Sequence, residues 1–163
     1  MVRTRVVPAV PVAMSAGDHL GIDLPGVRNA RGVGGLRTVY GRIVKNGRVF
    51  RSAGLHRLGD EGPAALSALD ITTVLDLRSG EEVRRAPDEV GAAEVVQLSL
   101  HDPLDPDGEA TVDAAAATTS LRDIYLKIVR ERGEALAAGV REVAVSDGAA
   151  WCIARSARTA PGC

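Results

Sequence analysis

A β-branched apolar run that leads directly into a helix start constrains the fold of this 163-residue chain most strongly. Residues Thr72–Leu77 have the length and composition of a buried strand. Ser79 and Glu82 then have the spacing of a capping box, in which each side chain accepts a hydrogen bond from the other residue's backbone N–H. A strand that runs into a helix in this way predicts an α/β fold with a largely parallel sheet.

Further strands are expected on both sides of this unit. Thr38–Tyr40 and Arg48–Phe50 have strand character, and the Asn46-Gly47 turn between them predicts a hairpin-like excursion. Val95–Leu100 has the composition of another strand. Asp147-Gly148 is a turn that should lead into one more buried strand.

Two helical regions complete the predicted alternation. Asp60 can cap a helix that runs to about Leu69, with Ala64, Leu66 and Leu69 on its inner face. Ser120 begins the clearest helix, which Gly133 interrupts. Its apolar stripe makes Tyr125 a predicted core residue and continues through Leu136, Val140 and Val143.

The chain is expected to hold one domain. Residues 1–19 have the character of a disordered tail, residues 20–150 form the domain, and residues 101–119 have the composition of a long surface loop. Basic and acidic residues balance at 20 against 21, which gives no electrostatic reason to expect nucleic acid or an anionic membrane surface as a partner. No apolar run approaches the roughly 18 residues of a membrane span.

The cysteines favour a reducing compartment. Both of them, Cys152 and Cys163, lie near the end of the chain, so a disulfide framework is not indicated and a cytoplasmic location is expected. The three histidines are scattered and predict no metal site. No cofactor is expected.

Cys152 and Arg158 have the Cys-X5-Arg spacing of a phosphate-binding catalytic loop. In such a loop the backbone N–H groups point at a phosphate, and the cysteine attacks as a thiolate. The arginine holds two phosphate oxygens. One such pair is a weak signal by itself, and a free thiol in a chain end explains it as well.

Three upstream segments carry a stronger signal. Leu24–Gly35, Arg48–Leu58 and Thr73–Glu82 resemble, in order, the segments LPGxxNFRDxGG, GRLFRSxxLxxL and DLRSxxE of the bacterial tyrosine/serine protein phosphatase family. Gly32 departs from the family, which has Asp there. The resemblance implies a three-layer cysteine-phosphatase-like fold and a phosphotyrosine-bearing protein or another phosphomonoester as substrate. It also implies a metal-free mechanism through a cysteinyl-phosphate.

The family signature HCxxGKDRTG is not matched at residues 151–163. Residues 150–163 can be back-translated with one choice of synonymous codons. When a single cytosine is inserted before the codon of Trp151, these codons translate from position 151 onward as LVHCTVGKDRTGL. The hypothesis is therefore that a frameshift near Ala150 makes residues 151–163 an aberrant tail. On this hypothesis the chain is truncated, lacks its C-terminal helices and is inactive, and the true nucleophile lies two positions beyond Cys152.

The resemblance assigns roles to further residues. Asp102 is a candidate general acid, although an ordinary loop aspartate explains it equally, and His101 beside it is expected to be a solvated loop residue. Arg31, Arg51 and Arg78 are candidate anion binders, with structural ion pairs favoured for the last two. Asp76 is expected to fix a loop by accepting hydrogen bonds.

Two other functions remain open. A non-catalytic pseudophosphatase would bind a partner through its intact upstream part. A rhodanese-like sulfurtransferase also uses a cysteine loop, although the upstream segments speak against it.

Overall fold

Five strands form a single sheet in the computed structural model, which describes residues 21–100 and 120–154. They are β1 (Arg31–Gly32), β2 (Val49–Ser52), β3 (Ile71–Asp76), β4 (Glu94–Gln97) and β5 (Ala149–Ile153). The strands lie in the order β1-β2-β5-β3-β4. Every neighbouring pair is parallel except β1 with β2. The largely parallel sheet predicted from the sequence is thus confirmed.

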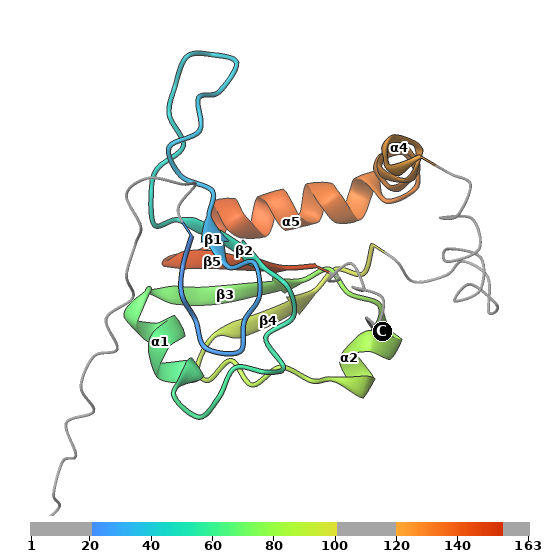
Figure 1. Ribbon diagram of the computed structural model, residues 1–163. Helices are drawn as coiled ribbons and strands as arrows, with labels where there is room; N and C mark the ends of the chain where they lie inside the picture. The colour runs from blue at the N-terminus through green and yellow to red at the C-terminus, as the bar shows by residue number, and fades with distance from the viewer. Residues whose placement is uncertain (1–20, 101–119, 155–163) are drawn as a thin grey trace, which may run out of the picture.

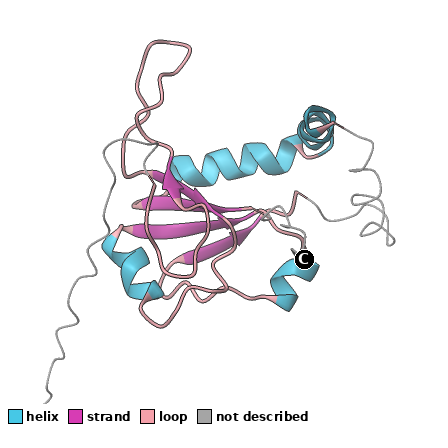
Figure 2. Ribbon diagram, in the orientation of Figure 1, coloured by secondary structure: helices cyan, strands magenta, loops and turns pink. Residues whose placement is uncertain are grey.

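Helices cover both faces of the sheet and give the three layers predicted (Figures 1 and 2). α1 (Gly62–Ala68) and α2 (Gly80–Arg85) lie on one side. α4 (Leu121–Glu131) and α5 (Gly133–Val145) lie on the other side, where α5 runs along the sheet. The capping box is present, since the Ser79 hydroxyl accepts from the Glu82 N–H at 3.2 Å and the Glu82 carboxylate accepts from the Ser79 N–H at 3.2 Å.

The main core lies between the sheet and α1. Trp151 of β5 is fully buried there and stacks on Phe50 of β2, with ring centroids 5.4 Å apart. Its indole Nε1 donates to the Ser52 hydroxyl at 2.8 Å. Leu66 of α1 and Val74 of β3 belong to the same buried cluster. A chain with few aromatic residues therefore places its one tryptophan at the centre of the sheet.

Several predicted boundaries are wrong. Residues 38–40 form no strand but belong to the turn of an excursion between β1 and β2. The first helix has Glu61 at its N-cap position, without a side-chain cap, so Asp60 does not cap it. Its buried positions include Ala65 and not Ala64, because residues 62, 65, 66 and 69 share one face at the helical spacing i, i+3, i+4, i+7, and position 64 lies on the opposite face.

The second helical region begins and divides as predicted, but its apolar stripe is not buried. Ser120 caps α4 by accepting from the Asp123 N–H at 3.2 Å, and α5 begins at Gly133. Tyr125 is 66% exposed and Val140 is 70% exposed, so the prediction of core positions for them is wrong. α5 turns Gly139 toward the sheet instead, and Val129 of α4 and Val145 of α5 are exposed as well.

The final strand includes residues that the sequence assigns to an aberrant tail. The turn at Asp147-Gly148 leads into β5, as predicted, and β5 continues through position 153. The side chains at positions 151 and 153 are both fully buried. The predicted tail at residues 1–19 and the predicted loop at residues 101–119 lie outside the described residues.

Candidate active site

The carboxyl ends of the three central strands meet at one edge of the sheet. Ser52 of β2 and Asp76 of β3 both pair with Ile153 of β5. The ladder continues one step further, because the Leu77 N–H donates to the Ile153 carbonyl at 2.9 Å and the Ala154 N–H donates to the Ser52 carbonyl at 3.3 Å. We call this the carboxyl edge. In open α/β sheets, ligands bind outside such an edge where the strand order reverses.

The strand order reverses at β5. The chain passes from β2 to β3 without pairing them, and β5 later fills the place between the two. Ala154 therefore lies at the centre of the carboxyl edge, between the ends of β2 and β3. This is the geometry in which a catalytic loop is flanked by supporting loops on both sides.

Cys152 lies inside β5 and not in a loop. It pairs with Arg51 of β2 and Leu75 of β3. Paired residues share a face of the sheet, and Leu75 faces Gly139 of α5, so Cys152 faces the α5 side. The thiol is free and half-buried. Burial raises its pKa, and the nearby positive charge of Arg51 lowers the pKa by less.

This placement does not suit a catalytic nucleophile. A phosphatase cysteine needs a lowered pKa, so that it is a thiolate near neutral pH. It also needs loop N–H groups that point at a phosphate in front of it. Cys152 has the opposite pKa shift, and its backbone is part of the sheet ladder on both sides.

The remaining predicted catalytic residues cannot be compared with this position. Arg158 and Asp102 both lie outside the described residues, as does His101. The assignments of a phosphate clamp and a general acid therefore stay predictions. Of the three predicted catalytic residues, only Cys152 has a described position.

Arg78 forms a buried ion-pair network behind the carboxyl edge. Its Nε donates to Asp76 Oδ1 at 2.9 Å, and its Nη2 lies 2.6 Å from Asp76 Oδ2 and 2.6 Å from Asp88 Oδ2. Nη1 donates to the Ala86 carbonyl at 3.0 Å. The structural ion pair predicted for Arg78 is confirmed. A guanidinium engaged on all three nitrogens has little capacity left to bind substrate.

The same network fixes the loop after β3. The Arg78 N–H donates to Asp76 Oδ1 at 3.0 Å, so Asp76 is a loop-fixing acceptor, as predicted. Burial alone would lower the pKa of Arg78, but the hydrogen bond with Asp76 and the charge of Asp88 outweigh burial and raise it. The residues Asp76 and Arg78 of the DLRS segment thus position the capping box of α2 at the carboxyl edge.

Asp88 is the member of this network that sequence reasoning missed. Its carboxylate is almost fully buried, and Oδ1 has no hydrogen-bond partner among the described residues. Burial raises its pKa despite the charge of Arg78, and the neighbouring Asp76 raises it further. Its place after Pro87 gives no sign of burial, since an aspartate beside a proline is typical of an exposed turn.

Arg51 and Arg31 differ from Arg78. They are neighbours in the β1–β2 ladder, and Arg31 donates to Asn29 Oδ1 at 2.9 Å. Arg51 is exposed and has no ion-pair partner in the described part of the chain, so the structural ion pair favoured for it is not found. Gly32, the departure from the family segment, pairs with Phe50.

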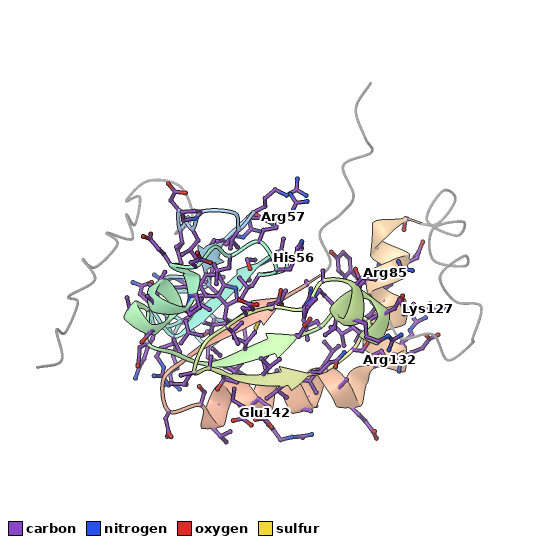
Figure 3. The ribbon with its side chains drawn as sticks, turned by 90° about the horizontal axis from the view of Figure 1, so that it is seen from below. His56, Arg57, Arg85, Lys127, Arg132 and Glu142 are labelled. Carbon is purple, nitrogen blue, oxygen red and sulfur yellow. The ribbon has the colours of Figure 1, made fainter. Side chains whose placement is uncertain are left out.

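Glycines bring the matched segments together. Gly26 has a φ of +79°, and a Cβ at this position would collide with the carbonyl of Arg57 in the loop after β2. A Cβ at Gly54 would lie 2.8 Å from Nδ1 of His56 and 3.2 Å from Nη1 of Arg78. His56 and Arg57 lie side by side in this loop (Figure 3). The first segment thus packs on the second, and the second on the third.

The described residues show neither a metal site nor a membrane-spanning helix. They contain no group of three or more histidine, cysteine, aspartate or glutamate side chains that could hold a metal ion. They also contain no helix with the length and apolar character needed to cross a membrane.

Comparison with known proteins agrees with this geometry. Residues 22–154 match the tyrosine phosphatase family, so the match covers most of the chain and ends with β5. Over 102 residues the chain is 40% identical to the triple specificity protein phosphatase PtpB of Mycobacterium tuberculosis. This matched stretch covers 61% of the chain and 34% of that relative. The chain therefore spans about a third of that relative's length. It belongs to the tyrosine phosphatase family.

Proposed function

We propose that the carboxyl edge is the scaffold of a protein tyrosine phosphatase that hydrolyses phosphomonoesters through a cysteinyl-phosphate, without a metal ion. A phosphotyrosine-bearing protein or another phosphomonoester is the substrate, and the enzyme acts in the cytoplasm. The match of residues 22–154 to the tyrosine phosphatase family favours a phosphatase over the sulfurtransferase considered from the sequence. The position of β5 carries the proposal, because this strand delivers the following loop between two loops that the sheet holds in place.

We further propose that Cys152 is not the nucleophile and that the chain with the given sequence is inactive. The raised pKa of Cys152 and its place within the ladder support this. In the shifted reading frame a histidine falls at position 153 and the cysteine falls at position 154, the first position after β5. A cysteine there is free to begin a loop, which Cys152 is not.

The chemistry follows from such a loop. The thiolate sulfur attacks phosphorus, and the ester oxygen leaves with a proton from a general acid, for which Asp102 is the candidate. Water then attacks the cysteinyl-phosphate. It gives its proton to the same carboxylate and releases inorganic phosphate and the thiolate. Loop N–H groups and an arginine bind the phosphate oxygens throughout.

The test begins with the gene sequence across codons 145–165. Both reading frames are then expressed, and phosphate release from a phosphotyrosyl peptide is measured. We expect activity from the frame with the inserted base, and its loss when the cysteine at position 154 is replaced by serine. The given chain and its Cys152→Ser variant should both be inactive. Phosphate release by the given chain that Cys152→Ser abolishes would show that Cys152 is the nucleophile after all.

One observation favours the second candidate, a pseudophosphatase. Trp151 fits the core fully, with a stacked ring and a hydrogen-bonded indole. The given residues therefore complete the sheet, and a stable binding module is possible without catalysis. If the gene sequence is confirmed as given and the purified chain is a folded monomer, this candidate replaces the enzyme.

A further inference from the structure

The excursion between β1 and β2 is an exposed finger with an ordered backbone. We define the finger as residues 33–48, which project beyond the sheet at the top of Figure 1. Its two sides are joined by the Gly35 N–H to the Val44 carbonyl and by the Val44 N–H to the Leu36 carbonyl, both at 2.9 Å. The Thr38 N–H donates to the Arg42 carbonyl at 2.7 Å and closes the end. The end of the finger is therefore a defined turn.

The side chains at the end of the finger are apolar and uncovered. Val39 is 94% exposed and Tyr40 is 88% exposed. Leu36 and Ile43 behind them are 56% and 61% exposed. Single exposed apolar residues are ordinary, but four of them within the eight positions 36–43 of one projecting turn are a concentration that is typical of an interaction site.

The charges around this apolar end all have one sign. Residues 24–59 contain eight basic side chains and no acidic one, and all 21 acidic residues lie elsewhere in the chain. Arg37, Arg42 and Lys45 belong to the finger itself, and all three are exposed. The charge of the whole chain is balanced, and that balance predicts no anionic membrane partner. Residues 24–59 are nevertheless strongly basic.

We propose that the finger docks on the surface of an anionic lipid bilayer. Val39 and Tyr40 insert at the boundary between headgroups and acyl chains, while Arg37, Arg42 and Lys45 contact the anionic headgroups. Two observations favour a bilayer over a protein groove. The finger projects from the sheet and ends in a tight turn (Figure 1), a shape that can enter a bilayer surface. It also combines an aliphatic and a tyrosine side chain with a basic collar, which is the composition of interfacial membrane anchors.

The test measures sedimentation of the full chain with two kinds of vesicle. One contains phosphatidylcholine alone, and the other also contains phosphatidylserine, whose anionic headgroups attract basic side chains. We expect binding to the anionic vesicles that weakens with salt. Arg37→Gln with Arg42→Gln should weaken it about 25-fold, because each basic side chain near the surface contributes about fivefold. Val39→Ser with Tyr40→Ser should weaken it at least about tenfold.

Matched variants elsewhere control for nonspecific effects. Arg130→Gln with Arg141→Gln removes two exposed charges from α4 and α5. Val140→Ser with Val145→Ser removes two exposed apolar side chains from α5. Both double variants should bind as the unchanged chain does. Fluorescence of the buried Trp151 checks that every variant is folded.

Three results would overturn the proposal. The first is no binding, or equal binding to both kinds of vesicle. The second is an equal loss of binding in the finger variants and the control variants. The third is a dimer in gel filtration that Val39→Ser with Tyr40→Ser converts to a monomer, because the finger would then bind a second copy of the chain.

Discussion

Removal of Arg78 is the perturbation for which the structure predicts the largest loss of stability. The Arg78 side chain is 5% exposed, and the side chains of Asp76 and Asp88 are 3% and 5% exposed. The change Arg78→Ala leaves these two carboxylates close together without a counter-charge and leaves the Ala86 carbonyl without its donor. Breaking a buried ion pair by removing one partner costs about 3–5 kcal/mol.

That cost is large relative to the whole fold. Domains unfold with free energies of about 5–15 kcal/mol. At a urea dependence of about 2 kcal/mol per molar, the unfolding midpoint should fall by at least about 1.5 M. Equilibrium urea unfolding can be followed by the fluorescence of the one tryptophan, which is buried against Phe50. Arg51→Ala, at an exposed arginine, should change stability by less than about 0.5 kcal/mol.

A double variant separates charge from packing. Arg78→Met retains much of the buried volume, and Asp88→Asn removes one of the two orphaned charges. The pair together should cost less than the sum of the two single changes, by about 1–3 kcal/mol. The reasoning is refuted if Arg78→Ala costs no more than Arg51→Ala, or if the double variant shows no coupling.

Three further predictions concern the core and its titratable groups. Ser52→Ala should cost about 1–3 kcal/mol in urea unfolding, because it leaves the buried indole N–H of Trp151 without an acceptor; an unchanged midpoint would contradict this. Cys152 should react slowly with iodoacetamide at pH 7, because burial raises the pKa of its thiol. In a Cys163→Ser background, its rate in the folded chain should be at least about tenfold below its rate in the urea-unfolded chain. A fast reaction of the folded chain would indicate a thiolate and a nucleophile. The pKa of Asp88 is raised on folding, so its stabilising contribution is present below the ordinary aspartate value near about 4 and is lost as pH rises through the folded value. Asp88→Asn should therefore gain stability relative to the unchanged chain between pH 4 and pH 7, and a constant difference across that range would show that the pKa is not raised.

The sheet and its order of elements could be predicted because the signals are local. A β-branched run, a capping box and a glycine turn each act within a few residues, and β3, α2 and the start of α5 lie within one or two residues of their expected places. The family resemblance predicted the cysteine-phosphatase-like fold, and the structure adds that the second and third segments contain β2 and β3, which end at the carboxyl edge.

What could not be predicted depends on contacts between distant segments. Thr38–Tyr40 has strand composition, but no neighbouring strand is available to pair with it at the end of the finger. Tyr125 follows a helical stripe, but the described residues provide no surface to bury it. The burial of Asp88 arises from Arg78, ten residues away, and no local pattern indicates that meeting.

The place of β5 in the sheet also governs when the protein can fold during its synthesis. β1 and β2 form one half of the sheet and β3 and β4 form the other, and in the described structure only β5 pairs with both halves. Residues 149–153 are also synthesised after the other four described strands. Until they emerge, the nascent chain exposes two unpaired parallel edges that favour aggregation. Chaperone dependence should therefore persist at least until β5 has emerged, and any change of reading frame upstream of position 149 should yield a chain that is degraded and not merely inactive.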